Sequence, residues 1–171
     1  ATGDLDEADP VLSRAAKIDP NLASARANLG ALFAERRKWS TALEHLDAAL
    51  AIDASMADAH NNRGNVLISL GRPKEAEDAY IRALELSPKF ADAKFNQALL
   101  WLRQGKWSKA WPGFEARWQT RQLAPFQRSF EEPMWDGTPE PDKSVLLHAE
   151  QGMGDMLMVA RYLPMMTERV G

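Results

Sequence analysis

Beyond its first twenty residues the chain shows six stretches with helical patterning, separated by short breaks. In the central pair of stretches the break is Gly71-Arg72-Pro73. Pro73 suits the first turn of a helix, where the missing N–H costs nothing, and Pro88 stands just beyond a helix end. We therefore expect three helix pairs, with first helices near 23–36, 57–70 and 91–104 and second helices near 40–53, 73–86 and 107–120.

Residues of similar size return along the chain at a fixed interval of 34 positions. Three series of equivalent positions show this interval: Gly30, Gly64 and Ala98; Ala42, Ala76 and Ala110; Leu46, Tyr80 and Phe114. The small residues predict close crossings between the two helices of a pair, and the large ones predict its core. Generic amphipathic helices would show no fixed period. Three residues depart from this interval. Ala54 and Gln122 stand at the positions equivalent to Pro88, and Arg117 stands where the other repeats have alanine.

This spacing resembles that of the tetratricopeptide repeat, a 34-residue helix–turn–helix unit. The resemblance implies an all-α fold, a right-handed superhelix of antiparallel helix pairs. Full repeats are expected at 23–56, 57–90 and 91–124, the last atypical and rich in tryptophan, with the second helix of a truncated repeat at 1–20. Such a lone helix lacks a neighbour to cover its apolar face. We therefore expect this chain to be a fragment of a protein that extends further toward its N-terminus.

The last second helix carries an apolar face that the others lack. Trp107, Trp111, Phe114 and Trp118 fall at i, i+4, i+7 and i+11, on one side of a helix. We expect these four residues to form a docking seam for the chain that follows, with ordinary core packing as the alternative. Pro112 lies inside this helix and should kink it or make it start late.

The helical period ends after this repeat. Residues 125–143 contain four prolines and an Asp136-Gly137 turn signal, which predict an extended linker laid along the solenoid by its aromatic residues. A mobile tether is the alternative. Residues 144–171 then combine a strand-like run at 145–148, a tight loop at 150–155 and an apolar helix at 156–168. Strand, glycine loop and helix open a Rossmann-type unit, here truncated, because a single strand cannot make a sheet.

The sixth residue of every full repeat is asparagine: Asn28, Asn62 and Asn96. The 34-residue period would place these amides in a row on the concave face. Because an amide offers one acceptor and two donors, such a row matches the backbone of an extended peptide. Each hydrogen bond contributes only about 0.5–1.5 kcal/mol, so several must act together. The alternative is that each asparagine bonds the neighbouring repeat.

Further positions are expected on the same inner face, beside the asparagine row. They are Asn61, Asn65, Phe95, Leu99 and Arg103. Arg103 either pairs with an acidic group of a ligand or stands solvated at the surface.

A second candidate site is the loop before the last predicted helix, formed by Glu150, Gln151, Gly152, Gly154 and Asp155. Two glycines let the backbone approach a ligand, and a helix start favours a phosphate. The fingerprint is incomplete, because it lacks a third glycine and a P-loop lysine. Asp155 would also repel an anion, so a plain helix cap is the alternative.

The junction as a whole resembles a known arrangement through W-P-G-F-E-A-R-W at 111–118, W-D-G at 135–137, L-L-H-A-E-Q-G-M-G-D at 146–155 and A-R-Y-L-P at 160–164. Bacterial tetratricopeptide-repeat proteins with a C-terminal domain similar to the heptosyltransferases (glycosyltransferase family 9) run this way. The resemblance implies that Asp155 is a general base of a parent enzyme. The asparagine row is similar to the ladder of the O-linked N-acetylglucosamine transferase. Only the first strand, loop and helix of two lobes are present, so we expect no transferase activity from this chain.

Composition narrows the class of protein. The 171-residue chain has a net charge of −3, which gives no basic surface for nucleic acid. It has no cysteine, which fits a reducing compartment, and we expect a cytoplasmic location. No apolar run approaches the ~18 residues of a membrane span. The three histidines are too far apart in sequence for a metal site, and we expect no metal.

The sequence thus predicts a scaffold that binds a protein or an extended peptide, without enzyme activity or a cofactor of its own. The alternative is the N-terminal part of a glycosyltransferase whose repeats recruit a protein acceptor; a nucleotide sugar would bind only in the complete enzyme. Self-association is a further expectation, through the exposed N-terminal edge or the C-terminal strand-loop-helix segment.

Overall fold

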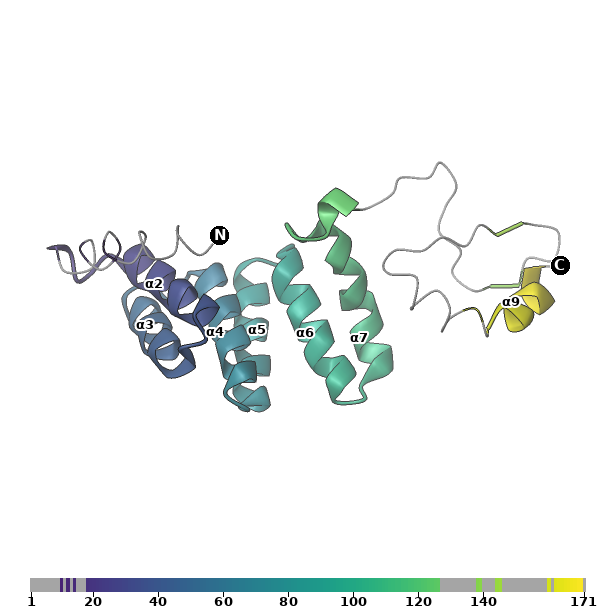
Figure 1. The fold of residues 1–171 in the computed structure, drawn as a ribbon, viewed down its shortest axis with the longest axis horizontal. Coiled ribbons are helices and arrows are strands. Elements are labelled where there is room, and N and C mark those ends of the chain that lie inside the picture. Colours follow the sequence, from purple (N-terminus) through teal and green to yellow (C-terminus); the bar gives the residue numbers. More distant parts are fainter. Residues whose placement is uncertain are drawn as a thin grey trace. The chain divides into compact units, whose positions relative to one another are not determined.

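The structure is a computed structural model that describes residues 18–126 and 162–170, together with the single positions 10, 12, 14, 138, 139, 144, 145 and 160. Six α-helices follow one another within residues 18–122 (Figure 1). They are α2 (Ala23–Glu35), α3 (Trp39–Ile52), α4 (Ala57–Ser69), α5 (Pro73–Leu86), α6 (Ala91–Arg103) and α7 (Trp107–Phe114). The bounds of α2 to α6 agree with the predicted helices to within one residue.

The six helices form three hairpins that stack in order. Each first helix packs on the second helix of its own pair, and successive pairs meet through α3 with α4 and α5 with α6. The first helices also contact one another, α2 with α4 and α4 with α6. In the described part of the chain the second helices, α3 with α5 and α5 with α7, contact one another less than the first helices do. The stack therefore curves toward the first helices, which line its inner face.

Each of the first two hairpins is closed by a glycine against a large apolar side chain. A Cβ on Gly64 would lie 2.7 Å from Cδ1 of Tyr80, and one on Gly30 would lie 2.6 Å from Cγ of Leu46. Carbon atoms in contact normally stay about 3.5–4.0 Å apart. Tyr80 and Leu46 are 2% and 0% exposed. The prediction that small residues mark the helix crossings and large ones the core is confirmed for the first two hairpins, whereas Phe114 in the third is only half-buried.

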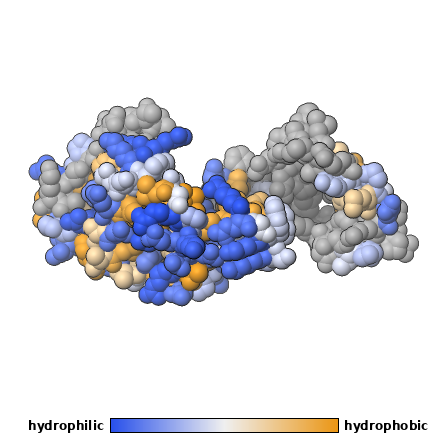
Figure 2. Space-filling view, turned by 90° about the horizontal axis from the view of Figure 1, so that it is seen from below, coloured by the Kyte–Doolittle hydropathy of each residue, from blue (hydrophilic) through white to orange (hydrophobic). Residues whose placement is uncertain are grey.

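Figure 2 shows hydrophobic side chains beside hydrophilic ones on the face of the helical array that this view presents. The largest fully buried side chains are Tyr80, Leu46, Leu67 and Val66, as expected for helices that each bury one side.

The turn inside each hairpin has a left-handed residue at the same repeat position. Arg37 has a φ of 57°, and Gly71 and Gly105 each have a φ of 72°. The next residue in each turn donates its N–H to a carbonyl five positions earlier, at 2.9 Å in all three hairpins. This pattern ends a helix at a left-handed residue, for which glycine has no steric penalty. Arg37 is the one exception among these three turns.

The hairpins are joined by apolar packing and by polar contacts, of which the Glu77 cluster is the largest in the described residues. Leu43 packs against the buried clusters of both the first and the second hairpin. Glu77 accepts a hydrogen bond from Trp101 Nε1 at 2.7 Å, and the Nζ atoms of Lys106 and Lys109 lie 3.6 Å from its carboxylate. The hydrogen bond from Trp101, followed by the two lysines, lowers the pKa of Glu77. This cluster ties α5 to α6 and α7.

The last hairpin departs from the prediction. Its second helix begins at Trp107 and Pro112 lies inside it, so of the two alternatives predicted for Pro112 the late start is excluded. After Phe114 the chain tightens into the 3₁₀ helix η1 (Glu115–Gln119). Pro112 has no N–H for the α-helical ladder, and Arg117 puts a large side chain where the other hairpins have alanine.

The chain divides into two units, residues 1–122 and 123–171. In the second unit the structure describes η2 (Ala124–Phe126) and α9 (Leu163–Val170). α9 overlaps the helix predicted at 156–168, and the described residues of the chain contain no strand. Residues 146–148 of the strand predicted at 145–148, the loop at 150–155 and most of residues 1–20 and of the 125–143 linker lie outside the described residues. The Rossmann-like unit therefore stays a prediction.

We predict that Gly64→Ala destabilises the chain. An added methyl group on an open helix surface would stabilise it by about 1 kcal/mol, but here it overlaps the Tyr80 ring, and overpacking costs about 1–3 kcal/mol. Urea unfolding should show a lower free energy of unfolding. Ala51→Gly, on the exposed side of α3, measures the propensity difference alone. A Gly64→Ala protein more stable than the parent would contradict the close crossing.

We predict that Arg37→Gly stabilises the first hairpin by about 0.5–1 kcal/mol, because glycine removes the steric cost of the left-handed backbone. Gly71→Arg is the mirror test, since nothing lies within 4 Å of a Cβ at Gly71 and only the backbone is strained. Thermal unfolding should shift upward for the first variant and downward for the second. Unchanged melting of both variants would refute the equivalence of the three turns.

Candidate functional site

The inner face is built from three positions that recur in each first helix. Residues 6, 9 and 13 of a repeat are spaced i, i+3 and i+7, so they share one side of a helix. Contacts between α2 and α4 and between α4 and α6 bring these sides together. The nine residues are Asn28, Ala31 and Glu35 in α2, Asn62, Asn65 and Ser69 in α4, and Asn96, Leu99 and Arg103 in α6.

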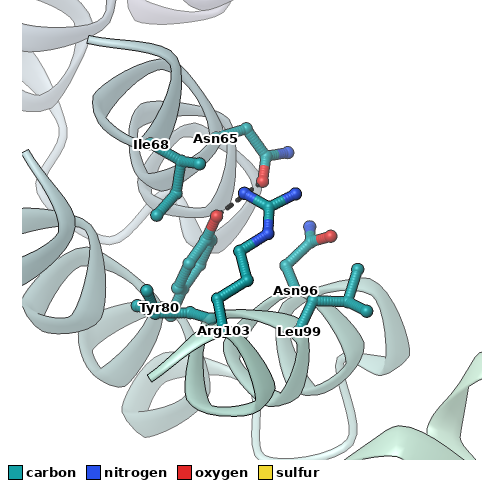
Figure 3. Close-up of a pocket in the computed structure, with 7 residues that line it drawn as sticks. Asn65, Ile68, Tyr80, Asn96, Leu99 and Arg103 are labelled. Atoms are coloured by element: carbon teal, nitrogen blue, oxygen red, sulfur yellow. Dashed lines mark hydrogen bonds between the residues drawn. The ribbon is translucent and has the colours of Figure 1, made fainter. Parts of the chain in front are cut away.

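A pocket of about 110 Å³ lies between α4 and α6, with α5 beneath it (Figure 3). Its lining consists of Asn65, Ile68, Tyr80, Asn96, Leu99, Leu100 and Arg103. The hydroxyl of Tyr80 donates a hydrogen bond to Oδ1 of Asn65 at 2.8 Å, which leaves the amide nitrogen of Asn65 to face outward. The pocket combines apolar walls with a guanidinium, a phenol and two amides.

A second pocket, of about 280 Å³, lies between α2 and α4. It is lined by Ala31, Ala34, Glu35, Asn62 and Asn65. Asn65 thus lines both pockets, which follow one another along the first helices of the three hairpins. We call the two pockets together the inner groove. An extended chain segment is the shape of ligand that fits such a run of pockets.

The three asparagines of the row, Asn28, Asn62 and Asn96, have different surroundings in the structure. Asn96 donates from Nδ2 to Oδ1 of Asn61 at 3.0 Å, which is the bond to a neighbouring repeat that was the alternative for this row. Asn61 is only 5% exposed and serves as the partner of Asn96. Asn62 lines the second pocket, and Asn28 is exposed but lines neither pocket. The row as a peptide ladder stays a prediction.

Sequence reasoning placed five residues that line the inner groove: Asn62, Asn65, Asn96, Leu99 and Arg103. It missed Tyr80 and Ile68, and it missed Glu35. The 34-residue period held the signal for Glu35, since this residue is the equivalent of Arg103 two repeats earlier. Phe95 lines neither of these two pockets, and its ring packs on Phe114 with centroids 5.5 Å apart.

The predicted docking seam is divided by the change to a 3₁₀ helix. Trp107 and Trp111 are 58% and 52% exposed. Phe114 turns inward against Phe95 and meets Trp111 edge-on, and Arg117 lies 4.7 Å over both Phe114 and Trp118. Two tryptophans therefore face solvent at the end of the stack, and docking on them stays a prediction.

Burial controls the electrostatics beneath the groove. It raises the pKa of the Tyr80 phenol well above its ordinary value, and the positive charge of nearby Arg103 offsets part of this rise. Tyr80 is therefore a neutral hydrogen-bond donor at physiological pH. Its role at the groove is to hold the Asn65 side chain in place.

The remaining predictions concern the loop at 150–155, metal binding and membrane spans. The loop formed by Glu150, Gln151, Gly152, Gly154 and Asp155 lies outside the described residues. Among the residues that the structure places, no three histidine, aspartate or glutamate side chains gather as metal ligands. No helix in the described part combines the length and apolar character needed to cross a membrane.

Comparison with known proteins gives one family match. Residues 57–90 match the model of the tetratricopeptide repeat. The peroxisomal targeting signal receptor of Candida albicans is 34% identical over 100 residues, covering 56% of this chain and 17% of the receptor. The protein FlbA of Caulobacter vibrioides is 26% identical over 170 residues, covering 96% of this chain and 28% of FlbA. The human protein O-mannosyl-transferase TMTC3 is 35% identical over 103 residues, covering 60% of this chain and 11% of TMTC3. The chain thus spans less than a third of each relative.

Solved structures show the same architecture. A crystal structure of MamA superimposes with a TM-score of 0.61 at 26% identity, covering 73% of this chain and 71% of MamA. The first tetratricopeptide-repeat domain of Spaghetti (RPAP3), bound to the HSP90 peptide SRMEEVD, gives a TM-score of 0.58 at 24% identity. The superposition covers 61% of this chain and 82% of that domain. At this sequence identity the similarity is one of fold only.

We predict a pH dependence that comes from Tyr80. The folded state holds the phenol proton more tightly than the unfolded state, so the unfolded chain releases it first as pH rises. The contribution of the protonated Tyr80 phenol to the free energy of unfolding is fully present below about pH 10. Above that pH it is lost, by up to about 1.4 kcal/mol per pH unit. Urea unfolding should show this fall, and Tyr80→Phe should lack that share of it. Equal alkaline slopes for both proteins would contradict the burial of the phenol.

Proposed function

Because the described helices form a tetratricopeptide-repeat solenoid, we propose that this region is a binding scaffold that holds an extended segment of a partner protein. The observation that carries the proposal is the inner groove, whose two pockets share Asn65 and cross all three hairpins. A groove of this length suits a peptide better than a compact small molecule. The region acts by binding and not by catalysis.

The amides give the groove a means of binding peptide backbone. Asn62 makes no side-chain hydrogen bond within the described residues, and Asn65 uses its Oδ1 but keeps its Nδ2 donors. Asn96 retains its Oδ1 acceptor and one Nδ2 hydrogen beyond the bond to Asn61. Backbone N–H and C=O groups are present in every peptide, so these amides would bind a segment with little regard to its side chains.

The comparisons support a binding role. A relative at 34% identity is a targeting signal receptor, and a solenoid of the same fold holds a bound peptide. Both observations concern those proteins. For this chain they agree with a groove whose free amides face outward.

A second proposal is that the solenoid recruits a protein acceptor to a glycosyltransferase in a longer parent protein. A human protein O-mannosyl-transferase contains a segment 35% identical to 103 residues of this chain. The heptosyltransferase-like sequence at 146–155 also supports it, with Asp155 as the proposed base and a nucleotide sugar as the donor. In that setting the inner groove would bind the acceptor polypeptide.

The binding role predicts a specific loss in an amide variant. Ten-residue peptides selected from a display library on the full chain would be measured by fluorescence polarisation. Asn62→Ala combined with Asn65→Ala should weaken them by roughly 1–3 kcal/mol, or fivefold and more, because backbone bonds are lost. Arg82→Ala on exposed α5 is the control and should leave affinity unchanged. Unchanged binding by the double variant would remove the amides from the account.

A further inference from the structure

The inner groove carries opposite charges at its two ends. Glu35, Ser69 and Arg103 occupy residue 13 of the three repeats, and all three are exposed. Glu35 lines the pocket at α2, and Arg103 lines the pocket at α6. Ser69 between them is neutral and donates its hydroxyl to the Asn65 carbonyl at 3.2 Å. One row of equivalent positions therefore runs from acidic through neutral to basic.

Arg103 is placed to receive an anion. No carboxylate forms an ion pair with it among the described residues, and its guanidinium lies beside the Tyr80 hydroxyl at the pocket mouth (Figure 3). The walls next to it are the apolar side chains of Ile68 and Leu99. A guanidinium presents paired donors that match a carboxylate, and apolar surroundings strengthen the attraction.

Glu35 is the counterpart at the other end. It lines a pocket whose other walls are alanine and asparagine, with no cation among them. The basic residues that follow it in the turn line neither pocket, and Lys38 lies over the Phe33 ring, 5.7 Å from its centroid. A basic side chain of a ligand would therefore meet the Glu35 carboxylate without a competing cation in the pocket wall.

We propose that the inner groove selects an extended segment with a basic side chain over Glu35 and an acidic side chain over Arg103, about five or six residues apart. The spacing follows from two helix-to-helix steps of about 8–10 Å each, or about 16–20 Å, and about 3.3 Å per extended residue. This inference rests on the proposed binding function and adds charge selection to it. The amides of Asn62 and Asn65 lie between the two charges.

The test uses four fluorescein-labelled ten-residue peptides with the same alanine, serine and leucine background. One carries Lys and Glu five residues apart, one carries two Lys, one carries two Glu, and one carries Lys and Glu side by side. The separated Lys–Glu peptide should bind the full chain at least about fivefold tighter than the other three.

Charge variants should then change the preference. Arg103→Glu leaves two acidic ends and should prefer the two-Lys peptide, whereas Glu35→Lys should prefer the two-Glu peptide. Lys74→Glu, on exposed α5, makes the same change in net charge as Arg103→Glu and should keep the parent preference. Circular dichroism would confirm that each variant is folded.

The outcomes separate the two proposals. Equal binding of all four peptides, unchanged in Arg103→Glu and Glu35→Lys, would overturn charge selection and leave the scaffold function standing. Absence of binding by all four peptides, together with failure of library selection, would overturn the scaffold function and this inference with it. A preference that moves in Lys74→Glu as much as in Arg103→Glu would assign the effect to net charge and also overturn the inference.

Discussion

The close crossing of the two helices in each hairpin is the constraint on which the rest of the structure depends. Gly30 and Gly64 let Leu46 and Tyr80 enter between the helices, and both large side chains are buried as a result. The crossing sets how closely the two helices approach in the first two hairpins, and the 34-residue period stacks all three hairpins in order. Stacking aligns equivalent residues along the first helices.

Tyr80 connects this core to the inner groove. Its ring fills the crossing at Gly64, while its hydroxyl reaches the pocket and holds Asn65. The Glu77–Trp101 hydrogen bond joins α5 to α6, the helices that carry Tyr80 and Arg103. Two groove amides, Asn65 and Asn96, are therefore held in position by side-chain hydrogen bonds before a ligand binds. Ordering these two side chains on binding costs little free energy.

The helix bounds and the crossings could be predicted because they depend on local signals that repeat, such as Gly71, Gly105 and Pro73. The left-handed backbone of Arg37 could not be predicted from its residue type, because it follows from the turn position that Arg37 shares with Gly71 and Gly105. The asparagine row was predicted from spacing alone, and spacing does not reveal that Asn96 has a partner in Asn61. Tyr80 was assigned to the core, and only the structure shows that its hydroxyl also reaches the groove. The 3₁₀ helix after Phe114 is not predicted, because a proline inside a helix indicates a kink and not a change of helix type.

The central claim is that repetition makes the inner face of α2, α4 and α6 the ligand surface. The most direct measurement is a map of backbone amide chemical shifts as a selected peptide is added to the isotope-labelled chain. The account predicts that shift changes concentrate around residues 6, 9 and 13 of each first helix, and that they recur in all three hairpins. Changes confined to the outward side of α3 and α5, or to a single hairpin, would contradict it.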